Sequence, residues 1–164
     1  MRWERLFDEI EQQSIDLAAM ERDALAADLE SERWQQTSWR DLVGGLVELD
    51  VEGVGVLQGR VRNVAELIEI ESDGRITWID PVRVVAATIA NRKRGTIGTD
   101  SWRSQLRQAS GLKVRVWSYT GASRAGILVT IGNDFVQLAS EPNRRDLVIP
   151  RSSMSAVTVT EFRA

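Results

Sequence analysis

The sequence contains one internal repeat, which constrains the fold more than any single motif because repeats define an architecture before local elements do. A Ser-Trp-Arg tripeptide opens each copy, at residues 38–40 and 101–103. The later matched segments follow at an offset that drifts from 66 to 69 residues, as loop insertions would cause. They are Gly45-Leu46 with Gly111-Leu112, Leu67 to Ile70 with Phe135 to Leu138, and Ile79-Asp80-Pro81 with Val148-Ile149-Pro150. The sequence therefore predicts two copies of one structural unit.

Each copy is rich in short strands. Apolar and polar residues alternate with a period of two, which is typical of half-buried strands. Ser72-Asp73-Gly74 is a tight-turn sequence between two such stretches. In the first copy the stretches are residues 46–51, 59–64, 67–71, 75–79 and 82–89. We therefore expect about five strands per copy, after a short helix or turn that a Ser residue caps.

A long amphipathic helix is predicted before the first copy. Residues 3–36 contain no Gly or Pro, and apolar residues recur there at spacings of three and four. They include Trp3, Leu6, Phe7, Ile10, Leu17 and Leu25. One small domain cannot cover about 50 Å of helix. We therefore expect part of this stripe to pack on a second helix, from this chain or from another copy.

Four segments follow from these patterns. They are an N-terminal amphipathic helix at residues 1–37, a first repeat at 38–91, a linker at 92–100 and a second repeat at 101–164. The linker contains an Arg-Lys-Arg-Gly run, which favours a turn-rich connection. The expected fold class is mainly β with α.

The second copy resembles the Sm-like family of small β-barrels. The resemblance rests on Gly111 before an alternating strand, on Gly126 and Leu128 in a Gly-x-Leu pattern, on the turn Gly132-Asn133-Asp134 and on the short crossover from Pro150 to Ser153. It implies two five-stranded Sm-like (SH3-like) barrels, each preceded by a short helix. With its opening Met1-Arg2-Trp3-Glu4-Arg5-Leu6-Phe7, the whole chain also resembles uncharacterised actinobacterial proteins that carry two such barrels.

Two residue types are absent and exclude much chemistry. The chain has no Cys and no His, so disulfides, Cys/His zinc sites and Ser-His-Asp or Cys-His catalytic groups are excluded. We expect no enzymatic activity, no cofactor and no metal site. No apolar run reaches the roughly 18 residues of a membrane span, and acidic residues begin at Glu4, unlike a signal peptide. We expect a cytoplasmic protein without a membrane partner.

Charge is segregated along the chain. Residues 1–38 carry a net charge of −6, residues 39–91 carry −4 and residues 92–164 carry +7. The basic third could attract an anionic partner, or it could neutralise the acidic segments of its own molecule. The sequence leaves both readings open.

One functional hypothesis is binding of RNA or single-stranded nucleic acid by the second repeat. Basic and aromatic residues expected outside that repeat could bind phosphates and stack on bases. They are Arg115, Trp117, Arg124, Arg144 and Arg145. Trp117 could equally pack against the other repeat or against the helix. The alternative hypothesis is a protein-interaction or assembly module that self-associates through the helix or through exposed edge strands.

Overall fold

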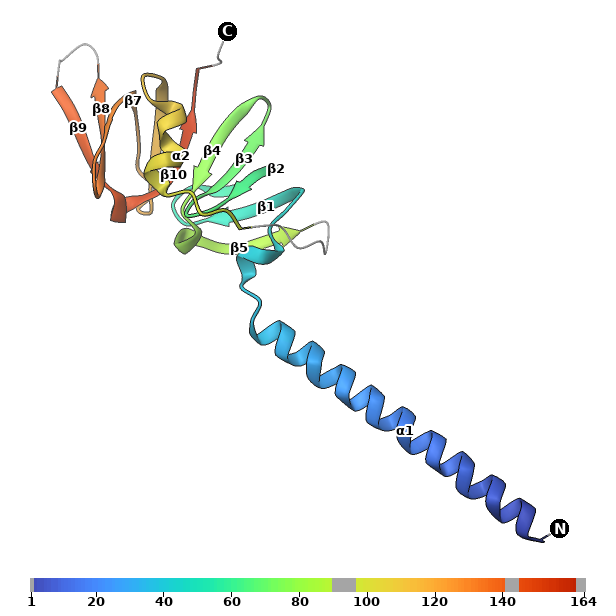
Figure 1. Cartoon of the computed structure of the whole chain (residues 1–164). Coiled ribbons are helices and arrows are strands. Elements are labelled where there is room, and N and C mark those ends of the chain that lie inside the picture. The colour runs from blue at the N-terminus through green and yellow to red at the C-terminus, as the bar shows by residue number, and fades with distance from the viewer. Residues whose placement is uncertain (1, 90–96, 141–144, 162–164) are drawn as a thin grey trace. The chain divides into compact units, whose positions relative to one another are not determined.

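The computed structural model describes residues 2–89, 97–140 and 145–161, and Figure 1 shows it as a cartoon. The chain divides into two compact units, Met1–Ser38 and Trp39–Ala164. The first unit is helical and the second is mostly β. Each is described by itself below.

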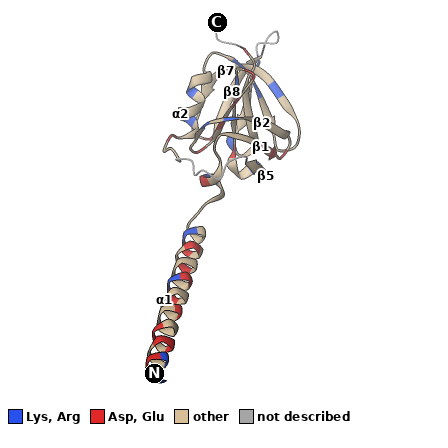
Figure 2. Ribbon diagram, turned by 90° about the vertical axis from the view of Figure 1, so that its right-hand side faces the viewer, with Lys and Arg blue, Asp and Glu red and all other residues tan. Residues whose placement is uncertain are grey.

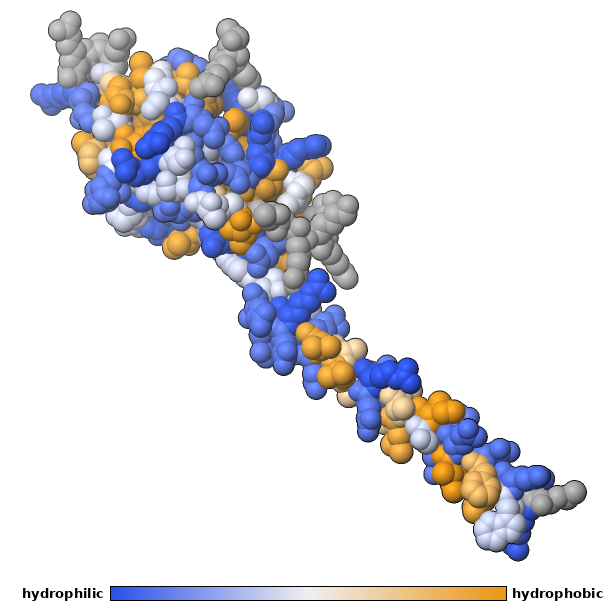
Figure 3. All heavy atoms as spheres, in the orientation of Figure 1, coloured by the Kyte–Doolittle hydropathy of each residue, from blue (hydrophilic) through white to orange (hydrophobic). Residues whose placement is uncertain are grey.

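The first unit is the long helix α1, Arg2–Gln35, which confirms the predicted N-terminal helix. None of its residues is buried, and its apolar side chains are exposed, among them Trp3, Phe7 and Met20. Figure 3 shows several orange groups along the helix, and Figure 2 shows more acidic than basic positions on it. The apolar spacing that the sequence predicts is therefore present on a continuous helix.

The second unit is built on one antiparallel sheet of ten strands. The strands lie in the order β5-β1-β2-β3-β4-β10-β6-β7-β8-β9. Their bounds are β1 Leu46–Val51, β2 Gly55–Val64, β3 Ile68–Ser72, β4 Arg75–Ile79, β5 Val84–Ile89, β6 Lys113–Ser118, β7 Ser123–Ile131, β8 Phe135–Ser140, β9 Arg145–Pro150 and β10 Met154–Val159. We call β1–β5 the first half and β6–β10 the second half.

Short helical turns connect the strands. The 3-10 turn η1, Trp39–Leu42, precedes β1, and the helix α2, Trp102–Leu106, precedes β6 and continues into η3, Arg107–Ala109. The side chain of Ser101 caps α2 by accepting a hydrogen bond from the backbone N–H of Ser104. Equivalent 3-10 turns join the last two strands of each half, η2 at Pro81–Arg83 and η4 at Arg151–Ser153.

The expected pair of closed five-stranded barrels is wrong. The sheet is open and continuous, because the outer edge of β4 pairs with β10 of the other half. A strand has only two edges. The edge that could have closed the first half on itself is therefore used to join the two halves.

The repeat predicted from sequence extends to strand register. The first strand of each half pairs with the fifth, and the second and third strands carry a register shift at the same place, Val61/Asn63 in one half and Leu128/Thr130 in the other. Equivalent pairs are Val47–Ile89 and Val114–Val159, Leu49–Ala87 and Val116–Val157, and Asp50–Ala86 and Trp117–Ala156. The fifth strands β5 and β10 are thus equivalent residue by residue.

The fourth strands β4 and β9 are aligned by their partners in β3 and β8. Ile68 lies opposite Ile79, and its equivalent Val136 lies opposite Ile149. Ile79 therefore corresponds to Ile149, one residue later than the match with Val148 that the sequence suggested. By the same register Trp78 corresponds to Val148.

Two hydrophobic clusters form the core, and each contains residues from both halves. Leu67 and Trp78 of the first half are buried in the cluster around Leu106, Val114 and Leu138. Ala156 of β10 is buried in the other cluster, which Trp117 also packs against. The two halves therefore share their cores.

Candidate functional site

The junction between the halves is a short strand pairing. Ala156, Val157 and Thr158 of β10 lie opposite Ile79, Trp78 and Thr77 of β4. The hydroxyl groups of Thr77 and Thr158 lie 3.0 Å apart and share a hydrogen bond across the strands. All but Thr158 of these six residues are buried. The junction is therefore as well covered as the rest of the core.

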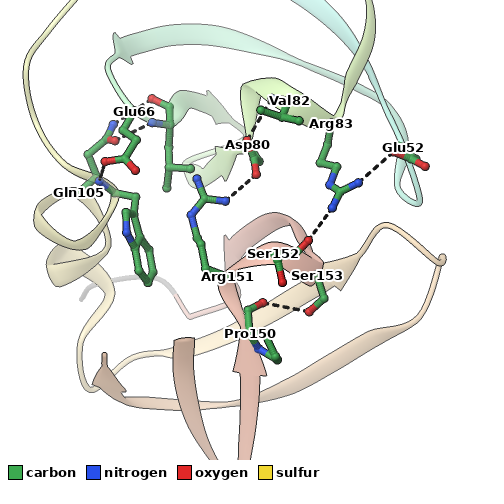
Figure 4. A network of polar contacts seen from close by, with 12 residues as sticks. Glu52, Glu66, Asp80, Val82, Arg83, Gln105, Pro150, Arg151, Ser152 and Ser153 are labelled. Atoms are coloured by element: carbon green, nitrogen blue, oxygen red, sulfur yellow. Dashed lines mark hydrogen bonds and ion pairs between the residues drawn. The ribbon is translucent and has the colours of Figure 1, made fainter. Parts of the chain in front are cut away.

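An ion pair crosses the same junction, between Asp80 and Arg151 (Figure 4). The Arg151 guanidinium donates to the Asp80 carboxylate at 2.5 Å and lies 5.4 Å from the centre of the Trp102 ring. The other carboxylate oxygen of Asp80 accepts a hydrogen bond from the backbone N–H of Val82. Both charged side chains are mostly buried, so the pair is screened less than one on the surface.

A second cationic side chain, Arg83, ties η2 to η4. Its guanidinium donates to the backbone carbonyl of Ser152 at 2.5 Å and lies 3.5 Å from a Glu52 carboxylate oxygen. It also lies 4.4 Å from the centre of the Tyr119 ring, within range of a cation–π interaction. Figure 4 shows Arg83 and Arg151 among the contacts that link the two halves.

Helix α2 provides a third link. The side-chain amide of Gln105 accepts a hydrogen bond from the backbone N–H of Leu67 and donates one to the backbone carbonyl of the same residue. The backbone N–H of Trp102 donates to Glu66. Because Gln105 is buried, these two hydrogen bonds satisfy its polar groups away from water.

The two ends of the sheet are the strands equivalent to those at the junction. Among the described residues, β5 pairs only with β1, and β9 pairs only with β8. Val85, Ala86, Ala87 and Thr88 are exposed, whereas their equivalents in β10 are buried except for Thr158. Val148 is 54% exposed, whereas its equivalent Trp78 is 1% exposed. Strand β5 at one end of the sheet is therefore the exposed equivalent of β10, and β9 at the other end is the exposed equivalent of β4.

A pocket lies beside the β5 edge, between that strand and η1. Its volume is about 270 Å³, and most of its lining is apolar. The lining residues are Trp39, Leu42, Val43, Val84, Val85, Ala86, Ala87 and Ile89. The strand that lines it, β5, has no partner on its outer side among the described residues.

One buried carboxyl group lies in the first half. Glu69 of β3 is 6% exposed and lies opposite Trp78. Burial raises the pKa of this carboxyl above its ordinary value, and the nearby Arg62 opposes the rise. This carboxyl group is therefore a buried titratable group in the core of the first half.

Four of the five residues that the sequence proposed for nucleic-acid binding are described, and they lie on different strands and faces of the sheet. Arg115 is half-buried and donates to the Ser123 hydroxyl at 2.8 Å. Its guanidinium lies 5.9 Å from the centre of the Trp117 ring, and Trp117 packs against the first-half cluster. Trp117 therefore packs against the other repeat, which was one of the alternatives that the sequence left open.

The two other described positions, Arg124 and Arg145, lie on different strands. Arg124 is exposed and lies opposite Val116, so it occupies the face of the sheet opposite to Arg115. Arg145 is exposed on the edge strand β9, separated from β6 by two strands. Arg144 lies outside the described residues.

Sequence reasoning missed the residues that join the halves, namely Asp80, Arg83 and Gln105. Their signal lies in a departure from the repeat. Pro150 is the equivalent of Asp80 and Leu42 that of Gln105, so at these two positions the polar side chain occurs in one copy only, whereas Arg83 has a polar equivalent in Ser153. A difference of this kind between the two copies identifies residues of the internal junction only after the pairing of β4 with β10 is known.

No family model matches the sequence, and no curated protein is significantly similar to it. No helix among the described residues is long and apolar enough to cross a membrane. Within the same residues, no cluster of three or more acidic side chains is placed to hold a metal ion.

Proposed function

We propose that the chain is an assembly module that binds further copies of itself by strand addition. In this assembly β9 of one copy pairs antiparallel with β5 of the next. The observation that carries the proposal is the β4–β10 junction. There the fourth strand of one half already pairs with the fifth strand of the other half, and β9 and β5 are the fourth and fifth strands that remain at the sheet ends. By equivalence, Ala86, Ala87 and Thr88 would lie opposite Ile149, Val148 and Leu147.

The composition of β5 supports this proposal. Exposed edge strands usually carry charged residues or Pro, which prevent pairing with another chain. Strand β5, Val84–Ile89, contains neither, and Val85 and its three following neighbours are exposed. An unprotected edge of this kind pairs readily with a partner strand.

The two ends of the sheet differ from each other, so the contact is head-to-tail. Such contacts give a ring when the rotation between copies closes and a filament when it does not. The polar links of the internal junction are missing at the new contact, since Pro150 and Pro81 stand at the places of Asp80 and Arg151. We therefore expect association that is weaker than the internal junction and depends on concentration.

Cross-linking tests the proposed register. The chain has no cysteine, so Ala87→Cys and Val148→Cys introduce single reactive thiols into two separate proteins. Side chains on directly opposed residues lie about 5 Å apart, so a short bifunctional thiol reagent should couple the two proteins when they are mixed. Each protein alone should stay uncoupled beyond a background of random collisions.

The control mixes the Ala87→Cys protein with a Val129→Cys protein. Val129 is similarly exposed, but it lies on β7 inside the sheet. Coupling that is equal in the two mixtures, or missing from both, contradicts the proposal.

Charge substitution gives an independent test of the same contact. Val148→Lys places a charge at the centre of the proposed pairing and should lower the mass found by sedimentation equilibrium. Val129→Lys should leave the mass unchanged. The double variant Ala87→Glu with Val148→Lys sets opposite charges against each other and should restore association.

Binding of nucleic acid by the second half stays a prediction of the sequence. Its test is a gel shift with mixed oligonucleotides at low and moderate salt. If it is right, removing Arg124 or Arg145 should lower the slope of log affinity against log salt by about one each. Because the halves share their cores, the test uses the full chain.

A further inference from the structure

The pocket between η1 and β5 has an equivalent in the second half, and that equivalent is filled. Residues at the equivalent positions are Trp102, Gln105, Leu106, Met154, Ser155, Ala156, Val157 and Val159. Five of these eight belong to the buried cluster that also contains Leu67 and Trp78 of the first half. The first half therefore fills the pocket of the second half.

The filling residues enter from two places. Leu67 directly precedes β3 and is held by its two backbone hydrogen bonds to Gln105. Trp78 lies in β4, opposite Val157 of β10. Both are almost fully buried, at 3% and 1% exposure. Two residues of the first half thus fill the pocket: Leu67, which directly precedes the third strand, and Trp78, which lies in the fourth strand.

The same two positions in the second half are Phe135 and Val148. Phe135 stands one residue before Val136, as Leu67 stands one before Ile68. Val148 corresponds to Trp78 through the β8–β9 register. Val148 is exposed and Phe135 is half-buried, with its ring against Gly132. In the described chain both therefore keep surface for a further contact.

We propose that the pocket between η1 and β5 receives Phe135 and Val148 of a second copy of this chain. The inference rests on the proposed strand addition and names the side chains that fill its interface. Pairing of β9 with β5 places Val148 opposite Ala87 in the pocket lining. Phe135 then follows from the neighbouring strand, as Leu67 does inside the molecule.

The polarity of the side chains fits this occupant. Val148 is smaller than Trp78, and Phe135 is larger than Leu67, so the pair changes in shape while staying apolar. The lining is also apolar on the β5 side, where Ala86 and Ala87 leave room beside the strand. Removal of this apolar surface from water would stabilise the contact.

The main test restores the residue that fills the internal pocket. Val148→Trp gives β9 the side chain that β4 carries, and it should tighten self-association about tenfold, measured by sedimentation equilibrium. The matched control Val129→Trp adds the same surface to an exposed position on β7 and should leave the association constant unchanged.

The second variant removes the other filling residue. Phe135→Ala should weaken association by about tenfold or more, and thermal unfolding checks that the variant keeps its fold. If Phe135→Ala does not fold, Val148→Trp still decides the question.

The outcomes separate this inference from the proposed function. The Ala87→Cys and Val148→Cys proteins report strand addition, and the same pair with Phe135→Ala in the second protein reports the pocket. Coupling in the parent pair with weaker coupling in the Phe135→Ala pair, together with tightening by Val148→Trp, supports the inference. Coupling in both pairs with no change in the association constant of either variant overturns the pocket occupant and leaves strand addition intact. No coupling in the parent pair overturns both.

Discussion

Single residues decide how the halves are held together, and Arg151 is the clearest case. Replacing Arg151 by Met removes the cation that faces the mostly buried Asp80 carboxylate and the Trp102 ring. An uncompensated carboxylate would remain, so we expect a loss of about 2–3 kcal/mol in the free energy of unfolding, measured by urea denaturation.

The matched control is Glu71→Gln. It removes the ion pair between Arg62 and Glu71, whose side chains are 49% and 38% exposed, and it should cost less than about 1 kcal/mol. A double-mutant cycle with Asp80→Asn isolates the coupling energy of the buried pair. Equal costs for the two ion pairs would contradict the assignment of Arg151 as a structural link.

A single residue, Glu69, should make the free energy of unfolding depend on pH. Burial raises the pKa of its carboxyl in the folded state. The stabilisation from its neutral form is complete below the unfolded-state pKa and is lost as the pH rises through the folded-state pKa. Glu69→Gln keeps this position neutral at every pH. We therefore expect the variant to differ little from the parent in acid and to be the more stable protein near neutral pH.

Thermal unfolding at a series of pH values measures this difference. The sign of the change is the critical observation. A difference between Glu69→Gln and the parent that stays constant with pH, or that favours the parent near neutrality, contradicts the raised pKa.

At the scale of elements, the sequence predicts most strands closely because alternation and turn residues are local signals. The stretches expected at residues 46–51 and 75–79 are β1 and β4 as observed. The last strand of the first half begins at Val84 and not at 82, because Pro81–Arg83 forms a 3-10 turn under the Asp80 cap. The helix expected over residues 1–37 spans Arg2–Gln35.

The β1–β2 hairpin shows how one element depends on a distant one. Gly53 in its turn has a φ of 80°, and a Cβ there would overlap the backbone carbonyl of Ser118 in β6. Gly53→Ala should therefore destabilise the protein by about 2 kcal/mol or more, through backbone strain and lost close packing. Chemical denaturation measures the loss.

Gly55 in the same hairpin is the matched control. Its φ of 95° is also positive, but a Cβ there would meet no atom within 4 Å. Gly55→Ala should then cost only the conformational penalty of about 1 kcal/mol. If the two substitutions cost the same, the hairpin does not pack closely against β6.

At the scale of the whole molecule, sequence reasoning gave the two repeats but not their connection. Alternation reveals which face of a strand is buried, as with the inward-facing Val114 and Val116. It carries no information on which strand lies at each edge, because backbone groups make those pairings in every sequence. The β4–β10 pairing and the dispersal of Arg124 and Arg145 therefore required the structure.

Shared cores predict that the two halves unfold together. Val47 is buried wholly in the cluster of the first half, whereas Leu67 belongs to the first half but is buried in the cluster of the second. Because each cluster needs residues from both halves, Val47→Ala and Leu67→Ala should each lower hydrogen-exchange protection in β1–β3 and in β6–β8 by similar amounts. We expect a loss of about 1–2 kcal/mol for Val47→Ala and about 2–4 kcal/mol for Leu67→Ala. Hydrogen exchange followed by mass spectrometry on the full chain resolves the strands separately. Protection lost from only the half whose cluster was altered would mean that the β4–β10 junction joins two independently stable bodies.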